Sequence, residues 1–189
     1  MPQLPRPYTE LLSETLITEE QLQTRIAELG AEISRDYAGQ DLLLTCILRG
    51  GVMFLTDLVR QISIPHMMDF MAVSSYGAGA RETSGQVRIT MDLTMDIAGR
   101  NVLLVEDIVD SGNTIASVLA LLQSRRPASL KVCSLLDKAS ARQAVVPVHY
   151  TGFNIPNKFV FGYGLDLDEY YRNLPFIGVV DTAKYKPST

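Results

Sequence analysis

The chain has 189 residues, of which 47% are hydrophobic and 20% are charged. This length corresponds to about one domain, and the composition excludes a disordered tail protein, a collagen-like fibre and a coiled coil. The formal net charge of −4 supplies no overall basic field, so nucleic acid is not an expected partner. Cys46 and Cys133 lie within apolar runs, which is typical of buried thiols in a reducing compartment.

The sequence contains no pattern typical of export or membrane insertion. Its most apolar stretch, residues 46–59, is interrupted by two charged residues and two glycines, and the first residues lack the apolar segment of a signal peptide. His66 and His149 lie far apart in the sequence, without a neighbouring cysteine, so no zinc site is expected. We therefore expect a cytoplasmic protein with no membrane partner.

The first predicted elements are a helix and a buried strand. Thr18 and Gln21 have the spacing of a capping box, and apolar residues recur at helical spacing as far as Tyr37, so residues 18–37 are expected to form an amphipathic helix. The proline-rich segment before it is expected to be extended. Residues 41–48 form a continuous apolar run, which is typical of a central parallel strand that is buried on both faces.

Helices and strands alternate along the rest of the chain. This alternation predicts an α/β protein with a parallel sheet flanked by helices. No repeat, low-complexity tract or long linker divides the sequence. The expected helices are residues 52–61 and 113–124, the expected strands are 67–73, 87–92, 102–105, 130–136 and 177–180, the β-like segments are 145–153 and 158–161, and a loop is expected at 74–85.

Residues 102–114 carry the most chemical information. They read Val-Leu-Leu-Val-Glu-Asp-Ile-Val-Asp-Ser-Gly-Asn-Thr, a buried strand that is followed by acids and by a Ser-Gly-x-Thr turn. In open α/β sheets ligands bind at the carboxyl ends of strands. Such a turn offers backbone amides, hydroxyls and a helix N-terminus to a phosphate group. We therefore expect a phosphate site at residues 111–114.

Glu106, Asp107 and Asp110 would repel a phosphate, so they require another partner. Three partners suit carboxylates at this place: the two hydroxyls of a ribose, a magnesium ion, or a proton that moves during a reaction. Turn and acids together predict a site for a ribose 5-phosphate. A helix cap with solvated acids is the simpler alternative.

Other phosphate-binding patterns are incomplete in this sequence. A P-loop requires G-x-x-x-x-G-K-[ST], which is absent. A dinucleotide-binding turn requires G-x-G-x-x-G, and the segments that begin at Gly77 and Gly162 both lack the third glycine. An ATPase or a nicotinamide-dependent dehydrogenase is therefore not expected.

Residues 105–114 resemble the phosphoribosyl-pyrophosphate motif of the purine phosphoribosyltransferases. Residues 48–51, 74–77, 135–138 and 159–172 match the hypoxanthine-guanine branch of that family in the same order. The resemblance implies a type I phosphoribosyltransferase fold, with a twisted parallel sheet flanked by helices. It also implies one domain over residues 1–189, with a core at about 18–150 and a small hood built from the N-terminal residues and about 151–189.

The activity that the resemblance implies is a step of purine salvage. A 6-oxopurine and phosphoribosyl pyrophosphate would give IMP or GMP and pyrophosphate, with Mg²⁺ as cofactor. Asp110 is expected to accept the proton from N7 of the base as N9 attacks C1 of the ribose. Magnesium would neutralise the leaving pyrophosphate. The expected metal-binding residues are Glu106, Asp107 and Asp166, the first two would also bind the ribose hydroxyls, and the 5-phosphate is expected on Ser111, Gly112, Asn113 and Thr114.

The resemblance assigns further residues to the base and to the pyrophosphate. Lys138 is expected to donate to O6 of a 6-oxopurine and to reject adenine, whose amine also donates. Phe159 would stack on the base, and Val160 would offer it backbone groups. The pyrophosphate is expected to contact Leu48, Arg49, Gly50 and Arg172, with a cis peptide bond between Leu48 and Arg49.

Residues 74–85 resemble the active-site lid of the family. A lid keeps water from a reactive sugar cation, and Ser75 and Tyr76 would face the pyrophosphate on closure. The loop has three glycines, and Tyr76 is its one side chain able to anchor to a core. We therefore expect the loop to be open in the absence of ligand.

Two alternatives of different kinds stay open. One is a phosphoribosyltransferase for another base, such as xanthine, adenine or uracil, and residues 158–166 argue against it. The other is a regulatory RNA-binding protein on the same fold, which would need a basic groove. Small-molecule substrates and a homo-oligomer, either a dimer or a tetramer, are the expected partners, and the order of preference among hypoxanthine, guanine and xanthine is left open.

Overall fold

The computed structural model describes residues 6–75 and 87–186. Its larger sheet has six strands in the order β4-β3-β2-β5-β6-β7. All neighbours in this sheet are parallel except β4, which pairs antiparallel with β3 at one edge. The strands are β2 (Leu42–Leu48), β3 (Met67–Ser75), β4 (Val87–Met91), β5 (Asn101–Val109), β6 (Ser129–Asp137) and β7 (Tyr150–Asn154).

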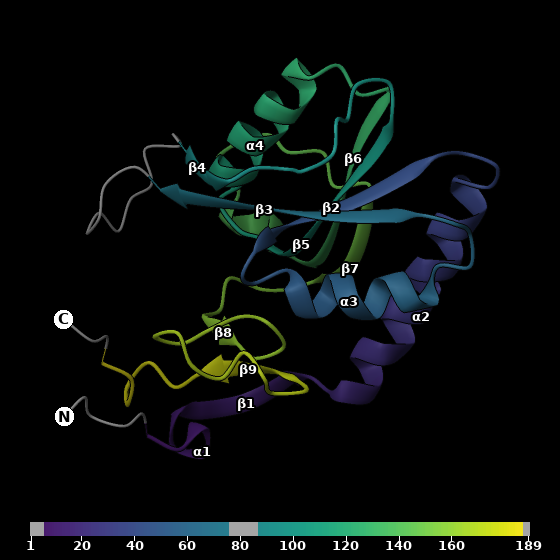
Figure 1. Ribbon diagram of the computed structural model, residues 1–189. Coiled ribbons are helices and arrows are strands. Elements are labelled where there is room, and N and C mark those ends of the chain that lie inside the picture. The colour runs from purple at the N-terminus through teal and green to yellow at the C-terminus, as the bar shows by residue number, and fades with distance from the viewer. Residues whose placement is uncertain (1–5, 76–86, 187–189) are drawn as a thin grey trace.

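Helices cover both faces of this sheet (Figure 1). The helices α2 (Glu19–Asp36) and α3 (Val52–Gln61) lie on one face and α4 (Asn113–Ser124) lies on the other, while a single 3₁₀ turn, η1, spans Ala139–Ala141. The capping box at the start of α2 is confirmed. The Gln21 amide donates to the Thr18 hydroxyl at 3.3 Å, and the Thr18 amide donates to the Gln21 side chain at 2.9 Å. The predicted parallel α/β sheet flanked by helices is therefore confirmed.

A second, three-stranded sheet is built from the two ends of the chain. It has the antiparallel order β1-β9-β8, from β1 (Leu12–Ile17), β9 (Ile177–Val180) and β8 (Val160–Phe161). A short helix, α1 (Tyr8–Leu11), precedes β1. Figure 1 shows this sheet apart from the larger one, on the side of α3. The expected extended segment before α2 contains β1, but the sequence pattern revealed neither α1 nor the pairing of β1 with β9.

The β-like segment expected at residues 145–153 is only partly a strand. Residues 145–149 are irregular, because Pro147 has no amide to donate and Val145 is 97% exposed. The strand begins at Tyr150 and pairs in parallel with β6, so residues 150–154 belong to the larger sheet and not to the second one.

Two further strand boundaries differ from the expectation. We expected a strand at 102–105 and then a polar turn, but β5 continues to Val109, so Glu106 and Asp107 lie within it. Pairing of Glu106 with Ser134 and of Ile108 with Leu136 in β6 satisfies the backbone whatever the side chains are. Similarly, β3 extends to Ser75, which pairs with Val87. Residues 76–86, which include Tyr76 and most of the expected lid, lie outside the described part of the chain.

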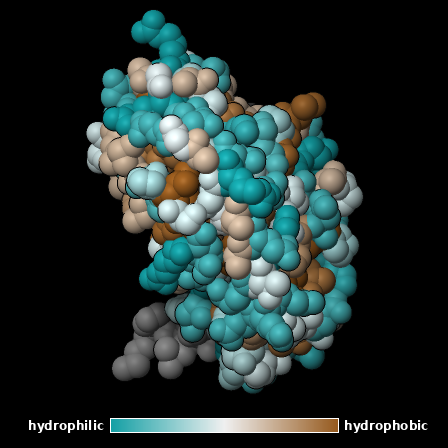
Figure 2. Space-filling view, turned by 90° about the vertical axis from the view of Figure 1, so that its right-hand side faces the viewer, coloured by the Kyte–Doolittle hydropathy of each residue, from teal (hydrophilic) through white to brown (hydrophobic). Residues whose placement is uncertain are grey.

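Three apolar clusters hold these layers together. One lies between the larger sheet and α2 and α3, the second lies under α4, and the third joins α1 to the second sheet. Cys46 and Cys133 are both free and buried, as predicted. The face shown in Figure 2 is mostly hydrophilic, with apolar residues in small separate areas. Among the described residues no helix is long and apolar enough to cross a membrane.

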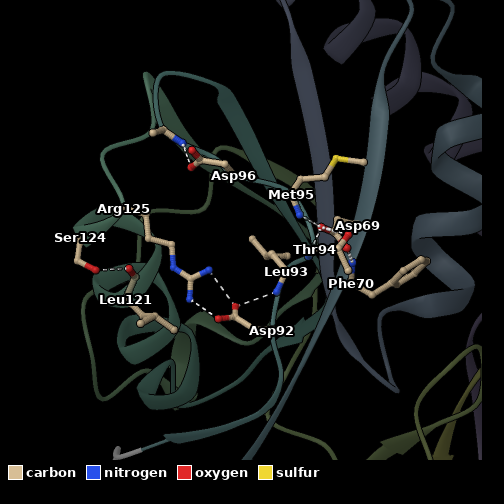
Figure 3. Close-up of polar contacts among 11 residues, drawn as sticks. Asp69, Phe70, Asp92, Leu93, Thr94, Met95, Asp96, Leu121, Ser124 and Arg125 are labelled. Atoms are coloured by element: carbon tan, nitrogen blue, oxygen red, sulfur yellow. Dashed lines mark hydrogen bonds and ion pairs between the residues drawn. The ribbon is translucent and has the colours of Figure 1, made fainter.

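Asp69, a buried acid of β3, holds the loop that follows β4 (Figure 3). Its carboxylate accepts hydrogen bonds from the amides of Phe70, Thr94 and Met95 at 2.7–2.9 Å and from the Thr94 hydroxyl at 3.1 Å. Burial raises the pKa of Asp69, but the hydrogen bonds from Met95, Phe70 and Thr94 outweigh burial, and the pKa lies below its usual value. The ionised carboxylate therefore stabilises the folded state.

We predict that Asp69→Asn lowers the free energy of unfolding at pH 7 by about 1–3 kcal/mol, because an amide nitrogen would face backbone amides that have no other acceptor. The pKa of Asp69 is lower in the folded state, so the wild-type advantage is complete above the unfolded pKa of about 3.9 and is lost as the pH falls through the lowered folded pKa. Urea denaturation of both proteins at pH 7 and near pH 3 measures this difference.

The matched control is Asp96→Asn, in the same loop, where an exposed carboxylate accepts from the amide of Ala98. That variant should change stability far less. A difference between wild type and Asp69→Asn that is the same at both pH values would contradict the role of the ionised carboxylate.

Candidate active site

A pocket of about 230 Å³ opens at the carboxyl ends of β2 and β5. This is the place where parallel sheets bind ligands. The pocket brings together the acids and the turn that the sequence singled out, along with residues that follow β2. Of the predicted site residues, its lining includes Leu48, Gly50, Glu106, Asp107, Asp110, Ser111, Gly112 and Thr114.

The turn before α4, where the sequence predicts a phosphate, lies at the start of the helix and lines the pocket. Gly112 is the N-cap of α4 with a φ of +84°, and no side-chain hydrogen bond caps the start of this helix. A β-carbon there would lie 3.0 Å from the Ala144 carbonyl oxygen, because the loop at 142–146 packs behind the turn. The carbonyl of Ser111 accepts from the amides of Gln143 and Ala144 at 2.9 and 3.0 Å. The turn is therefore held from behind while the pocket side stays available to an anion.

The two acids of β5 are unusual in their burial. Glu106 is 4% exposed, and its Oε1 is buried without a hydrogen-bond partner among the described residues. Burial raises the pKa of Glu106 well above its usual range, and the neighbouring Asp107 raises it further. Burial also raises the pKa of Asp107 to about 6, although the Ile108 amide and the positive charge of Arg172 oppose this rise. Among the described residues Glu106 Oε1 therefore lacks a donor or a cation, whereas Asp107 Oδ1 accepts from the Ile108 amide at 2.8 Å.

No group of three or more acidic, histidine or cysteine side chains within residues 6–75 and 87–186 is arranged to hold a metal ion. Glu106 and Asp107 line the pocket, whereas Asp166 does not. Asp166 instead accepts from Arg172 at 2.8 Å with one oxygen and from the Glu169 amide at 2.8 Å with the other. A cation in the pocket would therefore need additional oxygens from a ligand.

Lys138 and Asp110 meet at the edge of the pocket. The Lys138 Nζ lies 3.0 Å from Asp110 Oδ2, and the Lys138 amide donates to the Val109 carbonyl at 3.0 Å. The lysine is 5% exposed, whereas about half of the Asp110 side chain is exposed. The pair presents one donor and one acceptor next to each other, and the acceptor lines the pocket.

A second charged cluster lies next to this pocket. Arg172 binds Asp166 at 2.8 Å, the Gly164 carbonyl at 2.7 Å and Glu169 at 3.2 Å, and Glu169 also binds Arg49 at 3.0 Å. The cluster therefore contains both arginines that were expected to bind pyrophosphate. Glu169 was not among the residues expected at the site. Its spacing of three residues from both Asp166 and Arg172 was the one signal available for it.

The pocket and the charged cluster are joined by a close backbone contact. Gly164 has a φ of +98°, and a β-carbon there would lie 2.2 Å from the carbonyl oxygen of Gly50. A β-carbon on Gly50 would lie 1.8 Å from Oδ2 of Asp107. A side chain at Gly164 would meet the backbone of Gly50, whereas one at Gly50 would displace the Asp107 carboxylate. The segment at 162–172 thus packs directly on the residues that follow β2.

Other predicted site residues lie elsewhere. The peptide between Leu48 and Arg49 is cis, as the resemblance implied. Phe159 is 45% exposed, with its ring 5.7 Å from that of Tyr185, and Val160 is buried in the second sheet opposite Val179. Neither lines the pocket. The side chain of Asn113 points outside it to Gln143, at 3.1 Å.

Comparisons with known proteins match this architecture. A family model described as the phosphoribosyl transferase domain matches residues 14–168. The hypoxanthine-guanine phosphoribosyltransferase of Mycobacterium avium is 53% identical over 185 residues, which cover 95% of this chain and 91% of that protein. The hypoxanthine phosphoribosyltransferase of Escherichia coli is 49% identical over 169 residues, covering 88% of this chain and 94% of that protein.

The fold is matched by a solved structure. A crystal structure of a hypoxanthine phosphoribosyltransferase from Staphylococcus aureus superimposes with a TM-score of 0.92 at 43% sequence identity. The match covers 97% of this chain and 100% of that chain. The predicted type of sheet and the predicted family are therefore confirmed.

We predict that Gly164→Ala destabilises the fold far more than Gly39→Ala. Both glycines have a positive φ, +98° and +73°, so each alanine carries the strain of a left-handed backbone, about 1–2 kcal/mol. A β-carbon at Gly164 would lie 2.2 Å from the carbonyl oxygen of Gly50, whereas nothing lies within 4 Å of a β-carbon at Gly39. Thermal unfolding of both variants measures the difference, and equal melting temperatures would show that the contact with Gly50 contributes nothing.

Proposed function

Because the chain belongs to the phosphoribosyltransferase family, we propose that it transfers the phosphoribosyl group of phosphoribosyl pyrophosphate to hypoxanthine or guanine. The products are IMP or GMP and pyrophosphate, and the reaction is a step of purine salvage. Similarity to the hypoxanthine and hypoxanthine-guanine enzymes over most of the chain supports this substrate class. The observation that carries the proposal is the Lys138–Asp110 pair at the edge of the pocket.

The pair matches one edge of a 6-oxopurine. O6 accepts hydrogen bonds, and the adjacent N7 carries a proton that must leave when N9 forms a new bond. Lys138 and Asp110 offer a donor and an acceptor 3.0 Å apart, so the ammonium can bind O6 while the carboxylate faces N7. Adenine carries an amine in place of O6, and this amine would face the ammonium donor to donor. The pair therefore selects 6-oxopurines.

The remaining groups of the pocket suit the sugar phosphate. The 5-phosphate would bind Ser111, Gly112, Asn113 and Thr114 at the N-terminus of α4. The unpartnered oxygen of Glu106 and the partly buried Asp107 would accept hydrogen bonds from the ribose hydroxyls.

Magnesium fits the same acids. Glu106 and Asp107 would hold the ion in the pocket together with oxygens of the substrate, and Asp166 would face it from the charged cluster. When bound, magnesium neutralises negative charge on the leaving pyrophosphate. Oxygen ligands of this kind are those that Mg²⁺ prefers.

The chemical step needs one proton acceptor in this chain. The N9 lone pair forms a bond to C1 of the ribose, the C1–O bond to pyrophosphate breaks, and the N7 proton passes to Asp110. Lys138 keeps the Asp110 carboxylate oriented towards the base. Arg49 and Arg172 would bind the departing pyrophosphate as two charge-assisted donors.

We also propose a location in the cytoplasm and a homo-oligomeric assembly. Two free, buried thiols, Cys46 and Cys133, suit the reducing interior of the cytoplasm. We expect the chain to act as a homo-oligomer on small-molecule substrates.

We predict that Asp110→Asn lowers kcat by about 10²- to 10⁴-fold, because an amide cannot take the N7 proton. Binding of phosphoribosyl pyrophosphate should change much less, since its phosphate contacts lie on residues 111–114. Initial rates and equilibrium binding of both proteins test this, with Asp96→Asn as an exposed control. A kcat within about threefold of the wild type would rule out Asp110 as general base.

We predict that Lys138→Gln weakens hypoxanthine use and relaxes the rejection of adenine, because a neutral amide can donate to O6 or accept from an amine. The measurement is a set of initial rates with hypoxanthine, guanine, xanthine and adenine, each with and without magnesium. Lys131→Gln is the matched control, since Lys131 lies on the same strand, over the rings of Tyr37 and Tyr150. An unchanged KM for hypoxanthine, with adenine still refused, would count against this role of Lys138.

A further inference from the structure

Glu169 occupies the place between the two arginines expected to bind pyrophosphate. Its Oε1 lies 3.0 Å from Nη2 of Arg49, and its Oε2 lies 3.2 Å from Nη2 of Arg172. One carboxylate therefore bridges guanidinium groups that are 123 positions apart in the chain, Arg49 in the turn after β2 and Arg172 in the segment after β8. Glu169 has no role in the reaction proposed above.

The backbone around Glu169 holds this residue in an unusual conformation. Its amide donates to Asp166 at 2.8 Å, and its φ is +71°, a left-handed conformation that costs a residue with a side chain about 1 kcal/mol or more. Asp168 and Tyr171 on either side also have positive φ values, +53° and +68°. A sharp turn of this kind is kept only where its surroundings impose it, and here it directs the carboxylate to both arginines.

Arg172 does not depend on Glu169 for its position. It keeps the Asp166 carboxylate at 2.8 Å and the Gly164 carbonyl at 2.7 Å, and only 21% of its side chain is exposed. Its bond to Glu169 is longer, 3.2 Å, and lies on the exposed side of the cluster. Loss of Glu169 would therefore free a guanidinium donor without releasing the side chain.

A carboxylate and a pyrophosphate compete for the same donors. Both present oxygens that accept from guanidinium N–H groups, and an N–H that is bonded to Glu169 is not available to a ligand. The bridge is easily exchanged, because 69% of the Arg49 side chain and 58% of the Glu169 side chain are exposed, and ion pairs of this exposure are weak. Pyrophosphate has more oxygens and more negative charge, so it can displace the carboxylate.

We propose that Glu169 is an internal competitor that occupies the pyrophosphate site and lowers its affinity. The inference rests on the proposed function, since it takes Arg49 and Arg172 as the cations that bind pyrophosphate. In the free protein Glu169 neutralises these arginines, and it yields them when phosphoribosyl pyrophosphate binds. After the transfer Glu169 returns to them and so assists the release of pyrophosphate.

The test is the affinity of the full chain for magnesium pyrophosphate, measured by titration calorimetry. Glu169→Gln keeps the size of the side chain and removes its charge, and we expect it to bind pyrophosphate about 2- to 30-fold more tightly, the range that the loss of two exposed ion pairs produces. Glu169→Ala, which removes both acceptor oxygens, should change the affinity in the same direction. IMP, which has no pyrophosphate, should bind wild type and variants alike.

The matched control is Glu28→Gln. Glu28 forms an ion pair with Arg25, its side chain is 57% exposed, and it lies on α2, away from the pocket. This variant should bind pyrophosphate as the wild type does.

The sign of the change separates the outcomes. Unchanged or weaker binding of pyrophosphate by both Glu169 variants would overturn the proposal, because a residue that only orients the arginines would lower affinity when lost. If wild type binds neither magnesium pyrophosphate nor IMP, the proposed function fails and this inference fails with it. If wild type binds both and the variants do not bind pyrophosphate more tightly, the function stands and only the role of Glu169 is refuted.

Discussion

The contact between Gly50, Asp107 and Gly164 is the constraint on which the rest of the site depends. The carboxylate of Asp107 lies where a side chain on residue 50 would be, and the backbone of Gly50 lies where a side chain on residue 164 would be. This contact brings the end of β2, the end of β5 and the segment that carries Arg172 within reach of one ligand. A side chain at Gly164 would push the charged cluster away from the pocket, and one at Gly50 would displace the Asp107 carboxylate.

Opposite charges within the site are paired before any ligand arrives. Lys138 is paired with Asp110, Arg172 with Asp166, and Arg49 with Glu169. These pairs keep the functional groups oriented at little cost, because their partners are partly exposed and can be exchanged for substrate atoms. Glu106 of β5 differs, since its buried Oε1 has no hydrogen-bond partner among the described residues. Under the proposed function, ligand binding would replace internal partners at the edge of the site and supply a partner to Glu106 in its interior.

Local patterns predicted much of the fold. The capping box at Thr18, the bounds of α3 and α4, and the buried strand at residues 42–48 follow from spacing and composition, which act within a few residues. Two of the differences have a common cause. Strand β5 continues through Glu106 and Asp107 because it pairs with β6, and β1 forms near the N-terminus because it pairs with β9. Both partner strands are distant in the sequence. Pairing between strands can override the preferences of individual side chains.

The sequence by itself determined the α/β layers of the larger sheet, since the periodicity of apolar residues belongs to the chain. It singled out the acids of β5 and the turn before α4 as candidates, and the family resemblance added Lys138 and the two arginines as further candidates. Only the tertiary structure decided which of these meet: the Lys138–Asp110 pair, the closeness of Gly164 to Gly50, and the bridge that Glu169 makes between Arg49 and Arg172. These contacts join segments separated by up to about 120 positions, and no local pattern encodes them, because they arise when separate strands and turns pack at one edge of the sheet.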